Sequence, residues 1–416
     1  MSIEPAGGAE HTGSALRRCI SVDAVAFAKE CWDQRPLFSP AAAADGYDDL
    51  FSRAAAEELI TRRGLRTPFI RMAKQGSVLN AQTFTRSGGI GATIADQVAD
   101  DKVVTQLADG STLVLQGLHR TWPPLIDFAN VLADELGHPV QINAYITPPH
   151  SQGFAAHYDT HDVFVLQIAG PKHWTIHEPI LKHPLPDQSW EKYRSQVSAR
   201  AGESPLLDLT LNPGDALYLP RGYLHSAAAE HDLSIHLTVG IHPVTAHSLL
   251  REVLAMAADD EQLRASLPMA ADLADLTVLA PFAQSSLERL AKRLAEVEVD
   301  DLRRIADRVG SELRRDTRPA PLSVFDQTEV ISELTPRTAV QRRPHLHVTL
   351  HSHDSEVLLR YLDRELSFEL AAETALEQLL SGSVLTPAEL GGLDAVAQLE
   401  LVRVLLSNAV LVPVRA

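Results

Sequence analysis

The chain has 416 residues and a mass of 45.4 kDa, which is enough for two to four domains of roughly 100–200 residues each. Its 45% hydrophobic and 22% charged residues are typical of a globular protein and exclude a collagen-like or wholly disordered chain. The 37 Lys and Arg against 54 Asp and Glu give a net charge of −17. That charge repels nucleic-acid phosphates and favours basic proteins or peptides as partners.

Two features of the sequence bear on its compartment. Cys19 and Cys31 are too few for a disulfide framework, and we interpret both as structural thiols. No Lys or Arg precedes Arg17, the N-terminal residues hold no apolar signal core, and no run of about 18 apolar residues follows. We therefore expect a soluble, cytoplasmic protein.

The N-terminal third changes pattern twice. Residues 1–15 lack periodicity and are predicted to form a disordered tail. From Val22 to about Leu65 the pattern is helical and ends at Gly64, and residues 67–72 then resemble a strand.

Short apolar or alternating runs dominate residues 103–240, bounded by Gly, Pro and Asn-Pro-Gly-Asp turns. One helical stretch, residues 122–137, interrupts them. Many short strands separated by turns predict a sandwich or barrel of jelly-roll type rather than a doubly wound sheet. The runs are TLVLQG, VQINAYITP, DVFVLQI, HWTIHEP, ALYLP and SIHLTVGIH.

The remainder of the chain is predicted to form two further modules. Between Leu287 and Leu313 apolar residues recur every three to five positions, which indicates a helical domain over residues 247–316. The apolar stripe fits either a core or a dimer interface. Residues 317–343 carry Pro and Arg with few apolar side chains and are predicted to be a linker. In residues 344–416 a strand, short helices and a terminal strand suggest a winged-helix-like module.

The most specific chemical signal is the triplet His157-Tyr158-Asp159. On a strand, His157 and Asp159 would point to the same side and could bind one cation together. His225 lies 68 residues later, after the turn-forming Pro220 and Gly222, and would supply a third ligand. Two imidazoles and one carboxylate leave three metal positions open, which suits Fe(II) oxygen chemistry. An isolated H-x-D triplet is more often a structural or surface pair than a metal site, so the surrounding sequence decides between the two.

The sequence around the triplet resembles that of a known family. Residues 143–177, NAYITPPHSQGFAAHYDTHDVFVLQIAGPKHWTIH, together with LPRGYLHSA and SIHLTVG, resemble the ribosomal-oxygenase branch of the JmjC (cupin-like) oxygenases. The resemblance implies an α+β multidomain chain. It would have a double-stranded β-helix catalytic domain over residues 16–246, a helical dimerisation domain and a C-terminal winged-helix domain. It also implies Fe(II), 2-oxoglutarate and O2 as cofactors, and a homodimer.

On this resemblance, His157, Asp159 and His225 are the iron ligands, and Lys172 holds the distal carboxylate of 2-oxoglutarate. The residue type supports the role of Lys172, because a dicarboxylate needs a buried cation and a buried cation needs a carboxylate partner. The alternative is a solvated lysine in a turn.

The resemblance also places Asn143 and Tyr145 in the co-substrate and substrate pocket. Gly240 occupies a position where some members carry Ser or Thr near the co-substrate, and Thr238 is the candidate substitute. A strand amide satisfied by a neighbouring backbone group is the alternative for Asn143.

The leading hypothesis is a protein hydroxylase acting on a histidyl or arginyl side chain of a ribosomal or other basic protein, with lysine demethylation as a variant. One alternative is a non-oxidative metal-binding cupin, an isomerase or lyase. Another is a ligand-sensing regulator with a DNA-binding winged helix. Residues 344–416 hold four Arg, no Lys and ten acidic residues, a net charge of 4 − 10 = −6, which disfavours DNA.

Two other clusters receive structural interpretations. The histidines of the segment 345–353 all occupy odd-numbered positions, so they could lie on one face of a strand. We favour this interpretation over a second metal site. The glycine cluster Gly88-Gly89-Ile90-Gly91 lacks the Lys-Ser/Thr ending of a P-loop and is predicted to be a loop at the pocket entrance.

Overall fold

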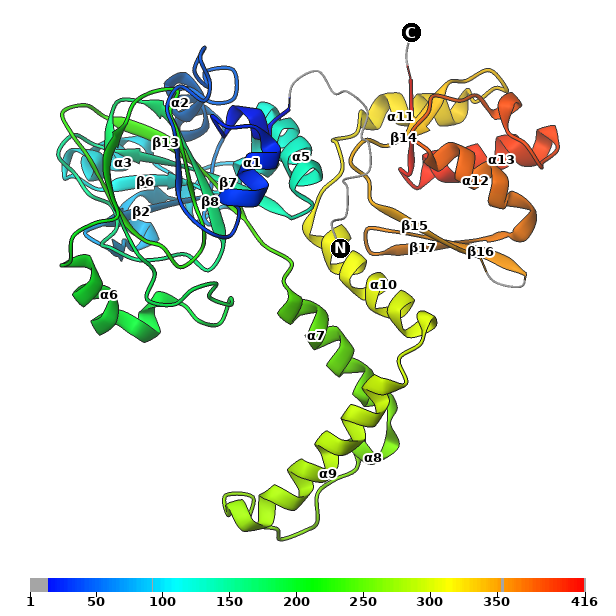
Figure 1. Ribbon diagram of the computed structural model, residues 1–416. Coiled ribbons are helices and arrows are strands. Elements are labelled where there is room, and N and C mark those ends of the chain that lie inside the picture. Colours follow the sequence, from blue (N-terminus) through cyan, green and yellow to red (C-terminus); the bar gives the residue numbers. More distant parts are fainter. Residues whose placement is uncertain (1–13, 92, 353–354, 415–416) are drawn as a thin grey trace. The chain divides into compact units, whose positions relative to one another are not determined.

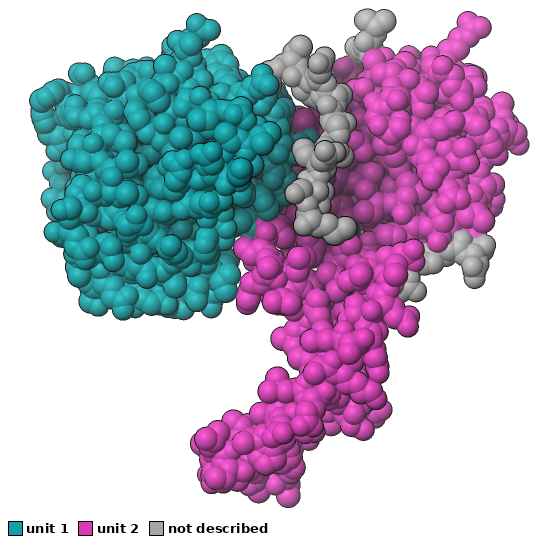
Figure 2. Space-filling view, viewed as in Figure 1, with its two compact units in different colours: residues 1–243 teal, residues 244–416 magenta. Residues whose placement is uncertain are grey.

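The computed structural model describes residues 14–91, 93–352 and 355–414 (Figure 1). The chain divides into two compact units, residues 1–243 and 244–416 (Figure 2). The tail expected over residues 1–15 lies outside the described residues except for its last two positions. Both cysteines are buried free thiols, as expected. Within the described part of the chain, no helix is both long and apolar enough to cross a membrane.

Two antiparallel sheets form the first unit. The large sheet has the strand order β1-β11-β8-β13-β7-β6-β2-β3, and the small sheet has the order β10-β9-β12. This arrangement confirms the predicted cupin-like architecture. The strands of the large sheet are β1 (Leu37–Ser39), β2 (Ile70–Lys74), β3 (Ser77–Val78), β6 (Thr112–Leu115), β7 (Val140–Thr147), β8 (Asp162–Ala169), β11 (Ala216–Leu219) and β13 (Ser234–Ile241). Those of the small sheet are β9 (Lys172–His177), β10 (Leu207–Leu211) and β12 (Leu224–Ala229), and β4 (Thr85–Arg86) pairs separately with β5 (Gln97–Val98).

Side-chain alternation gives the large sheet two different faces. On β7, Ile142, Ala144 and Ile146 are buried in a core that also contains apolar residues of helices α1 (Ala24–Glu30) and α5 (Pro123–Leu136). The intervening residues of the strand point to the opposite face, toward the small sheet. One face therefore builds the core while the other is available for a site.

Helix α5 begins and ends where the sequence predicts. Its first two residues are prolines, whose missing N–H groups cost nothing at a helix start. Gly137 ends it in the left-handed conformation, with φ of 69°. The other helices of this unit are α2 (Arg53–Arg62), α3 (Asp100–Ala108), α4 (Leu118–Thr121) and α6 (Arg194–Ala201).

The continuous helical pattern expected from Val22 to Leu65 is wrong. Helices α1 and α2 are separated by strand β1, which pairs with β11 at the edge of the large sheet. Pro36 and Pro40 flank the strand, and proline disfavours helical backbone at the residue before it.

The second unit begins with helices α7 (Ala246–Ala255), α8 (Glu261–Arg264), α9 (Leu276–Ala295) and α10 (Val299–Asp316). Ion pairs link α7 to α10, including Arg251 to Glu312 at 3.2 Å. The predicted apolar stripe is only partly buried. Ile305 is 7% exposed, whereas Leu287 and Leu302 are 65% and 57% exposed.

Residues 317–343, predicted to be a linker, contain regular secondary structure. They contain helix α11 (Val324–Ser332) and strand β14 (Val340–Arg342). The side chain of Gln327 is buried and donates hydrogen bonds of 2.8 Å to two backbone carbonyls of the C-terminal segment. Together with backbone pairing and the packing of Val340 in the C-terminal core, this buried amide holds the stretch in place.

The C-terminal module has its own hydrophobic core and also contains an unpredicted hairpin, β16–β17. Its histidine-bearing strand, β15, pairs with β16. The winged-helix interpretation of the module stays a prediction. The elements are β15 (Val348–Ser352), β16 (Glu356–Tyr361), β17 (Arg364–Glu369), α12 (Glu373–Leu380), α13 (Ala395–Ser407) and β18 (Leu411–Pro413), which pairs with β14.

Candidate active site

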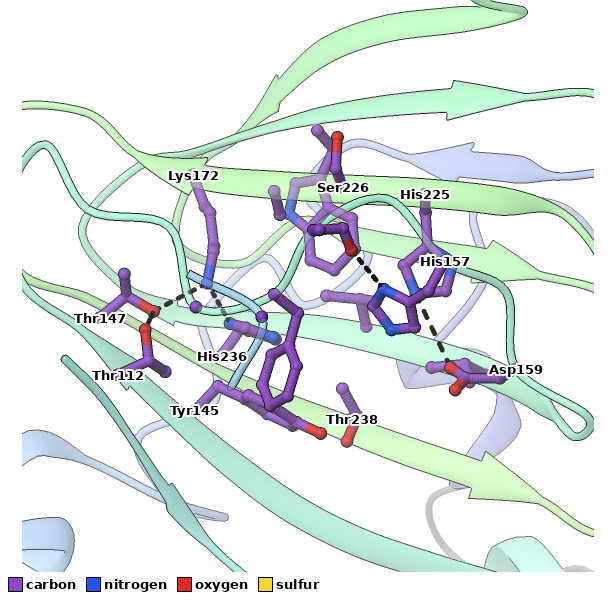
Figure 3. Close-up of a pocket in the computed structure, with 18 of the residues that line it drawn as sticks. Thr112, Tyr145, Thr147, His157, Asp159, Lys172, His225, Ser226, His236 and Thr238 are labelled. Carbon is purple, nitrogen blue, oxygen red and sulfur yellow. Dashed lines mark hydrogen bonds and ion pairs between the residues drawn. The ribbon is translucent and has the colours of Figure 1, made fainter. Parts of the chain in front are cut away.

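A cavity of about 350 Å³ lies between the two sheets of the first unit (Figure 3). Residues from both sheets and from the loop before β8 line it. Six of the seven residues singled out from the sequence are among them: Tyr145, His157, Asp159, Lys172, His225 and Thr238.

Asn143 is the exception. It does not line the cavity, because its amide oxygen accepts a 3.1 Å hydrogen bond from the backbone N–H of Gly117, just before α4. Its placement in the pocket is corrected accordingly, and the backbone-satisfied amide considered as the alternative is what the structure shows.

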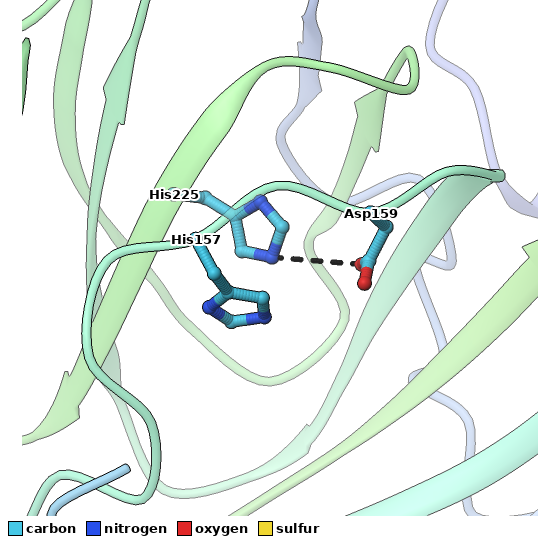
Figure 4. A group of neighbouring side chains, drawn as sticks. All are labelled: His157, Asp159 and His225. Atoms are coloured by element: carbon cyan, nitrogen blue, oxygen red, sulfur yellow. Dashed lines mark ion pairs between the residues drawn. The ribbon is translucent and has the colours of Figure 1, made fainter. Parts of the chain in front are cut away.

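His157, Asp159 and His225 converge at one end of the cavity (Figure 4). One ligand atom from each lies within 4.8 Å of the others, and Nε2 of His225 is 3.7 Å from Oδ2 of Asp159. In the part of the chain that the structure describes, no other group of three or more His, Cys, Asp or Glu side chains has such geometry.

The backbone brings these residues together differently from the expectation. His157 and Asp159 do not lie on a strand; they precede β8 in an extended loop. An isolated bridge joins this loop to β12, with His157 N–H donating to His225 O at 3.1 Å and His225 N–H donating to His157 O at 2.8 Å. The loop is therefore fixed against the strand that carries the third residue.

Gly222 completes the link between the two segments. Its N–H donates to the carbonyl of Asp159 at 3.0 Å. Its φ of 90° suits glycine, and an added Cβ would lie 2.4 Å from the carbonyl oxygen of Leu181. The Pro220–Gly222 turn identified from the sequence thus requires a glycine.

Hydrogen bonds orient both imidazoles. Nδ1 of His157 lies 2.8 Å from the carbonyl oxygen of Ala155, and Nδ1 of His225 lies 3.1 Å from that of Tyr223. Because a carbonyl only accepts, each neutral ring carries its proton on Nδ1 and leaves Nε2 free to bind a metal. Burial, followed by the nearby His157, lowers the pKa of His225 to about 4, so it is neutral at pH 7.

Asp159 supplies the anionic member of the group. Burial alone would raise the pKa of its carboxyl, but the imidazoles of His161, His225 and His157 outweigh that effect and bring the pKa below its ordinary value. Two imidazole nitrogens and one carboxylate oxygen therefore face a common point, which is a suitable donor set for a divalent transition metal.

Lys172 lies at the opposite end of the cavity (Figure 3). It is 3% exposed, its Nζ donates to Oγ1 of Thr147 at 3.0 Å, and Nδ1 of His236 is 3.4 Å away. Burial lowers its pKa to about 7. None of the ion pairs among the described residues involves Lys172, so no described residue supplies the carboxylate expected beside it.

A glycine also positions Lys172. Gly170, two residues earlier, has a φ of 61°, and a Cβ there would lie 2.4 Å from the carbonyl oxygen of Leu233. The tight turn between β8 and β9 lets β9 start at Lys172 with its side chain directed inward.

Sequence reasoning missed several polar residues of the cavity, Thr147 and His236 among them. Thr147 lies two positions after Tyr145 on β7, and His236 lies two positions before Thr238 on β13, so the two-residue period of a strand would have found both. His236 stacks on Tyr145 with ring centroids 5.0 Å apart. Trp174 lines the same cavity, and its Nε1 is buried with no hydrogen-bond partner among the described residues.

Two other predicted clusters lie away from the cavity. Gly89 and Gly91 line a separate surface hollow rather than the entrance. Of the histidines in the segment 345–353, His351 pairs with Asp307 at 2.8 Å, and His353 lies outside the described residues.

Comparison with known proteins finds a family match for part of the chain. Residues 123–249 match the JmjC domain family. The chain is 30% identical over 253 residues to ribosomal oxygenase 1 of Gallus gallus, and 41% identical over 116 residues to the bifunctional lysine-specific demethylase and histidyl-hydroxylase NO66 of Drosophila persimilis. The alignments cover 58% and 28% of this chain, but only 40% and 16% of those proteins.

The fold of the whole chain also has a solved counterpart. The ribosomal oxygenase YcfD of Escherichia coli superimposes with a TM-score of 0.55 over 95% of this chain and 99% of its own. The two are 16% identical, so this likeness concerns the fold. Another structure of YcfD, described as a complex with cobalt and 2-oxoglutarate, aligns with a TM-score of 0.54.

A buried ion cluster connects the chain segments that carry Asp159 and His225. The backbone N–H of Arg221 donates to Oδ1 of Asp162 at 2.8 Å, and its guanidinium lies 3.3 Å from the same oxygen and 2.7 Å from Asp33. The side chains of Arg221 and Asp162 are 6% and 0% exposed. This cluster joins the start of β8 to the turn that precedes His225.

We predict that Arg221→Leu lowers the free energy of unfolding by about 3–5 kcal/mol, because it leaves Asp162 as a buried, unpaired charge. Burial already raises the pKa of Asp162, so the loss should be smaller in mildly acidic than in alkaline buffer, where the carboxyl is ionised. Urea unfolding at both pH values measures this, and adding Asp162→Asn should restore part of the loss. An Arg221→Leu protein as stable as the parent would contradict this role.

Proposed function

We propose that the protein is an Fe(II)- and 2-oxoglutarate-dependent oxygenase that hydroxylates a side chain of another protein. The observation that carries the proposal is the pairing of two features in one cavity. A His-Asp-His donor set lies at one end, and a buried ammonium that forms no ion pair with any described residue lies at the other.

Each feature fits one part of the co-substrate. His157, Asp159 and His225 would hold Fe(II) from one side and leave three positions open for two atoms of 2-oxoglutarate and for dioxygen. Lys172 and Thr147 would bind the distal carboxylate. The ammonium is costly to bury alone, and a carboxylate arriving there offsets that cost. The cobalt and 2-oxoglutarate named for the structurally similar YcfD agree with this reading.

The overall reaction consumes one 2-oxoglutarate and one O2. One oxygen atom enters a C–H bond of the target as a hydroxyl, and the other enters succinate as the 2-oxoglutarate loses CO2. When bound, the iron and co-substrate supply the oxidising power, while the protein holds the reactants in place and excludes water. Phe154 and Trp190 flank His157 at 5.9 and 6.3 Å between ring centroids and would shield the reacting position.

For the target we propose a histidyl side chain of a ribosomal or other basic protein in the cytoplasm. The net charge of −17 attracts a basic partner, and the printed names of the related proteins include histidyl-hydroxylase and ribosomal oxygenase. Arginyl hydroxylation and lysine demethylation are the competing reactions. The charge of −6 over residues 344–416 argues against DNA as the partner of the C-terminal module.

The experiment that tests this function is mass spectrometry of ribosomal proteins incubated with the enzyme, Fe(II), 2-oxoglutarate and O2. We expect one added oxygen on a single peptide together with an equal amount of succinate. An unmodified set of ribosomal proteins would remove them as the substrate class, and succinate formation would then show whether the oxygenase chemistry itself holds.

We predict that His157→Ala, Asp159→Ala and His225→Ala each abolish metal-dependent succinate formation and weaken metal binding by at least about tenfold. The loss of one donor removes a bond and leaves water in its place. Binding of Mn(II) followed by calorimetry measures the affinity without turnover. His173→Ala, a histidine outside the cavity lining, is the matched control. Full activity in any of the three variants would contradict the assignment.

A further prediction concerns the protonation of Lys172. Since burial holds its pKa near 7, the amine is mostly neutral at pH 8, and a bound carboxylate should restore the ammonium. Binding of 2-oxoglutarate to the Mn(II)-loaded protein at pH 8 should therefore take up close to one proton, about 0.9 at most. Calorimetry in two buffers of different ionisation enthalpy measures the uptake. Lys172→Met should abolish it and weaken binding, whereas the exposed Lys29→Met should change neither.

For the second unit we propose a helical dimerisation domain followed by a winged-helix-like module. Leucines along α9 and α10 are exposed, including Leu276 and Leu287 at 74% and 65%. A second copy of the chain would cover them, because burying such side chains stabilises association by roughly 25 cal/mol per Å².

Light scattering after gel filtration should accordingly give about twice the chain mass of 45.4 kDa. Leu287→Glu combined with Leu302→Glu should shift the protein to monomer, because both residues are exposed on these helices. Val104→Glu, 65% exposed on α3 of the other unit, is the control and should leave the mass unchanged. A monomeric parent protein would rule the proposal out.

A further inference from the structure

Arg71 is a charged residue of the cavity that neither the donor set nor the co-substrate uses. It lies on β2, opposite Val114 of β6, which in turn lies opposite Tyr145 of β7. Directly opposed residues on neighbouring strands point to the same side of the sheet. The register therefore carries Arg71 to the same inward face as Tyr145, and Arg71 lines the cavity.

Arg71 helps to lower the pKa of the nearby Asp159 carboxyl, but its side chain forms no close ion pair with a described residue. Its Nε is buried without a hydrogen-bond partner among the described residues. The guanidinium carbon lies 5.5 Å from the ring centre of Phe154, and the phenol of Tyr145 accepts a hydrogen bond from it. Phe154 is also 5.9 Å from the ring of His157. The cation is thus held against the wall beside the donor set.

We propose that Arg71 determines the charge of the target side chain: the pocket accepts a neutral group such as an imidazole and rejects a guanidinium or ammonium. The inference rests on the proposed function and selects among its competing target residues. A cation entering beside Tyr145 and Phe154 would meet a fixed like charge in a partly desolvated cavity, where Coulomb repulsion is stronger than in water. A neutral imidazole meets no such penalty, and its ring can stack on the same aromatic wall.

Glu191 is the acidic residue that opposes this effect. It lines the outer part of the cavity but is exposed, and its carboxylate is hydrogen-bonded to Ser189 and lies near the exposed Arg194. Water screens such a group, so its attraction for an entering cation is weak. Asp159 also interacts electrostatically with Arg71, but its charge is directed to the metal that the donor set is proposed to bind.

Arginine and citrulline side chains test the inference because they have nearly the same shape and differ in charge. The probes are the Nα-acetyl amides of the two amino acids, and calorimetry with the protein loaded with Mn(II) and 2-oxoglutarate gives both dissociation constants. We expect wild-type protein to bind the citrulline amide at least about tenfold more tightly. Arg71→Gln should bring the ratio of the two constants near one, and Arg71→Glu should invert it.

Arg194→Gln is the matched control. Arg194 also lies over an aromatic wall residue, 5.3 Å from the ring of Trp190, but it does not line the cavity. The Arg194→Gln protein should keep the wild-type ratio of the two dissociation constants. Equal or tighter binding of the arginine amide to wild-type protein, equal ratios in Arg71→Gln and Arg194→Gln, or no binding of either amide to any variant would overturn the inference. Binding of 2-oxoglutarate in the same experiment reports separately on the proposed function.

Discussion

Two backbone hydrogen bonds between His157 and His225 are the constraint on which the pocket depends. They fasten an irregular loop to a regular strand, and the bond from Gly222 to the carbonyl of Asp159 adds a third connection. Each imidazole then donates to a carbonyl two residues earlier in its own segment. The same local geometry that closes the loop therefore also turns both ligand nitrogens toward Asp159.

The net charge of the whole chain is negative, whereas the cavity contains two cationic side chains. The chain carries a net charge of −17, which suits a basic macromolecular partner. Inside the cavity of the first unit, Lys172 and Arg71 are cations outside the ion pairs of the described residues. One stands where a dicarboxylate would end, and the other stands where a target side chain would enter. On the proposed function, the net charge would attract a basic protein, while the cavity would favour an anionic co-substrate and a neutral target.

Short-range sequence patterns predicted those parts of the fold and of the site that neighbouring residues determine. Alternating runs and turn residues gave most strands, and the spacing around the His157 triplet, together with the family resemblance, gave the donor set and Lys172. Side chains whose role depends on pairing between distant strands were not accessible. Arg71 reaches the cavity only through the registers of β2, β6 and β7, and Asn143 leaves it for a backbone N–H that composition does not reveal. In residues 317–343, a buried amide and a few apolar side chains join the C-terminal core through contacts with distant residues, which composition does not reveal.

The most direct test of the account is a visible absorption titration of the anaerobic, Fe(II)-loaded protein with 2-oxoglutarate. The account predicts a weak charge-transfer band that saturates at one equivalent, because chelation of the ferrous ion by the keto acid requires the donor set and the buried ammonium in one cavity. No band, or a band of equal strength and affinity in a protein lacking both His157 and His225, would contradict it.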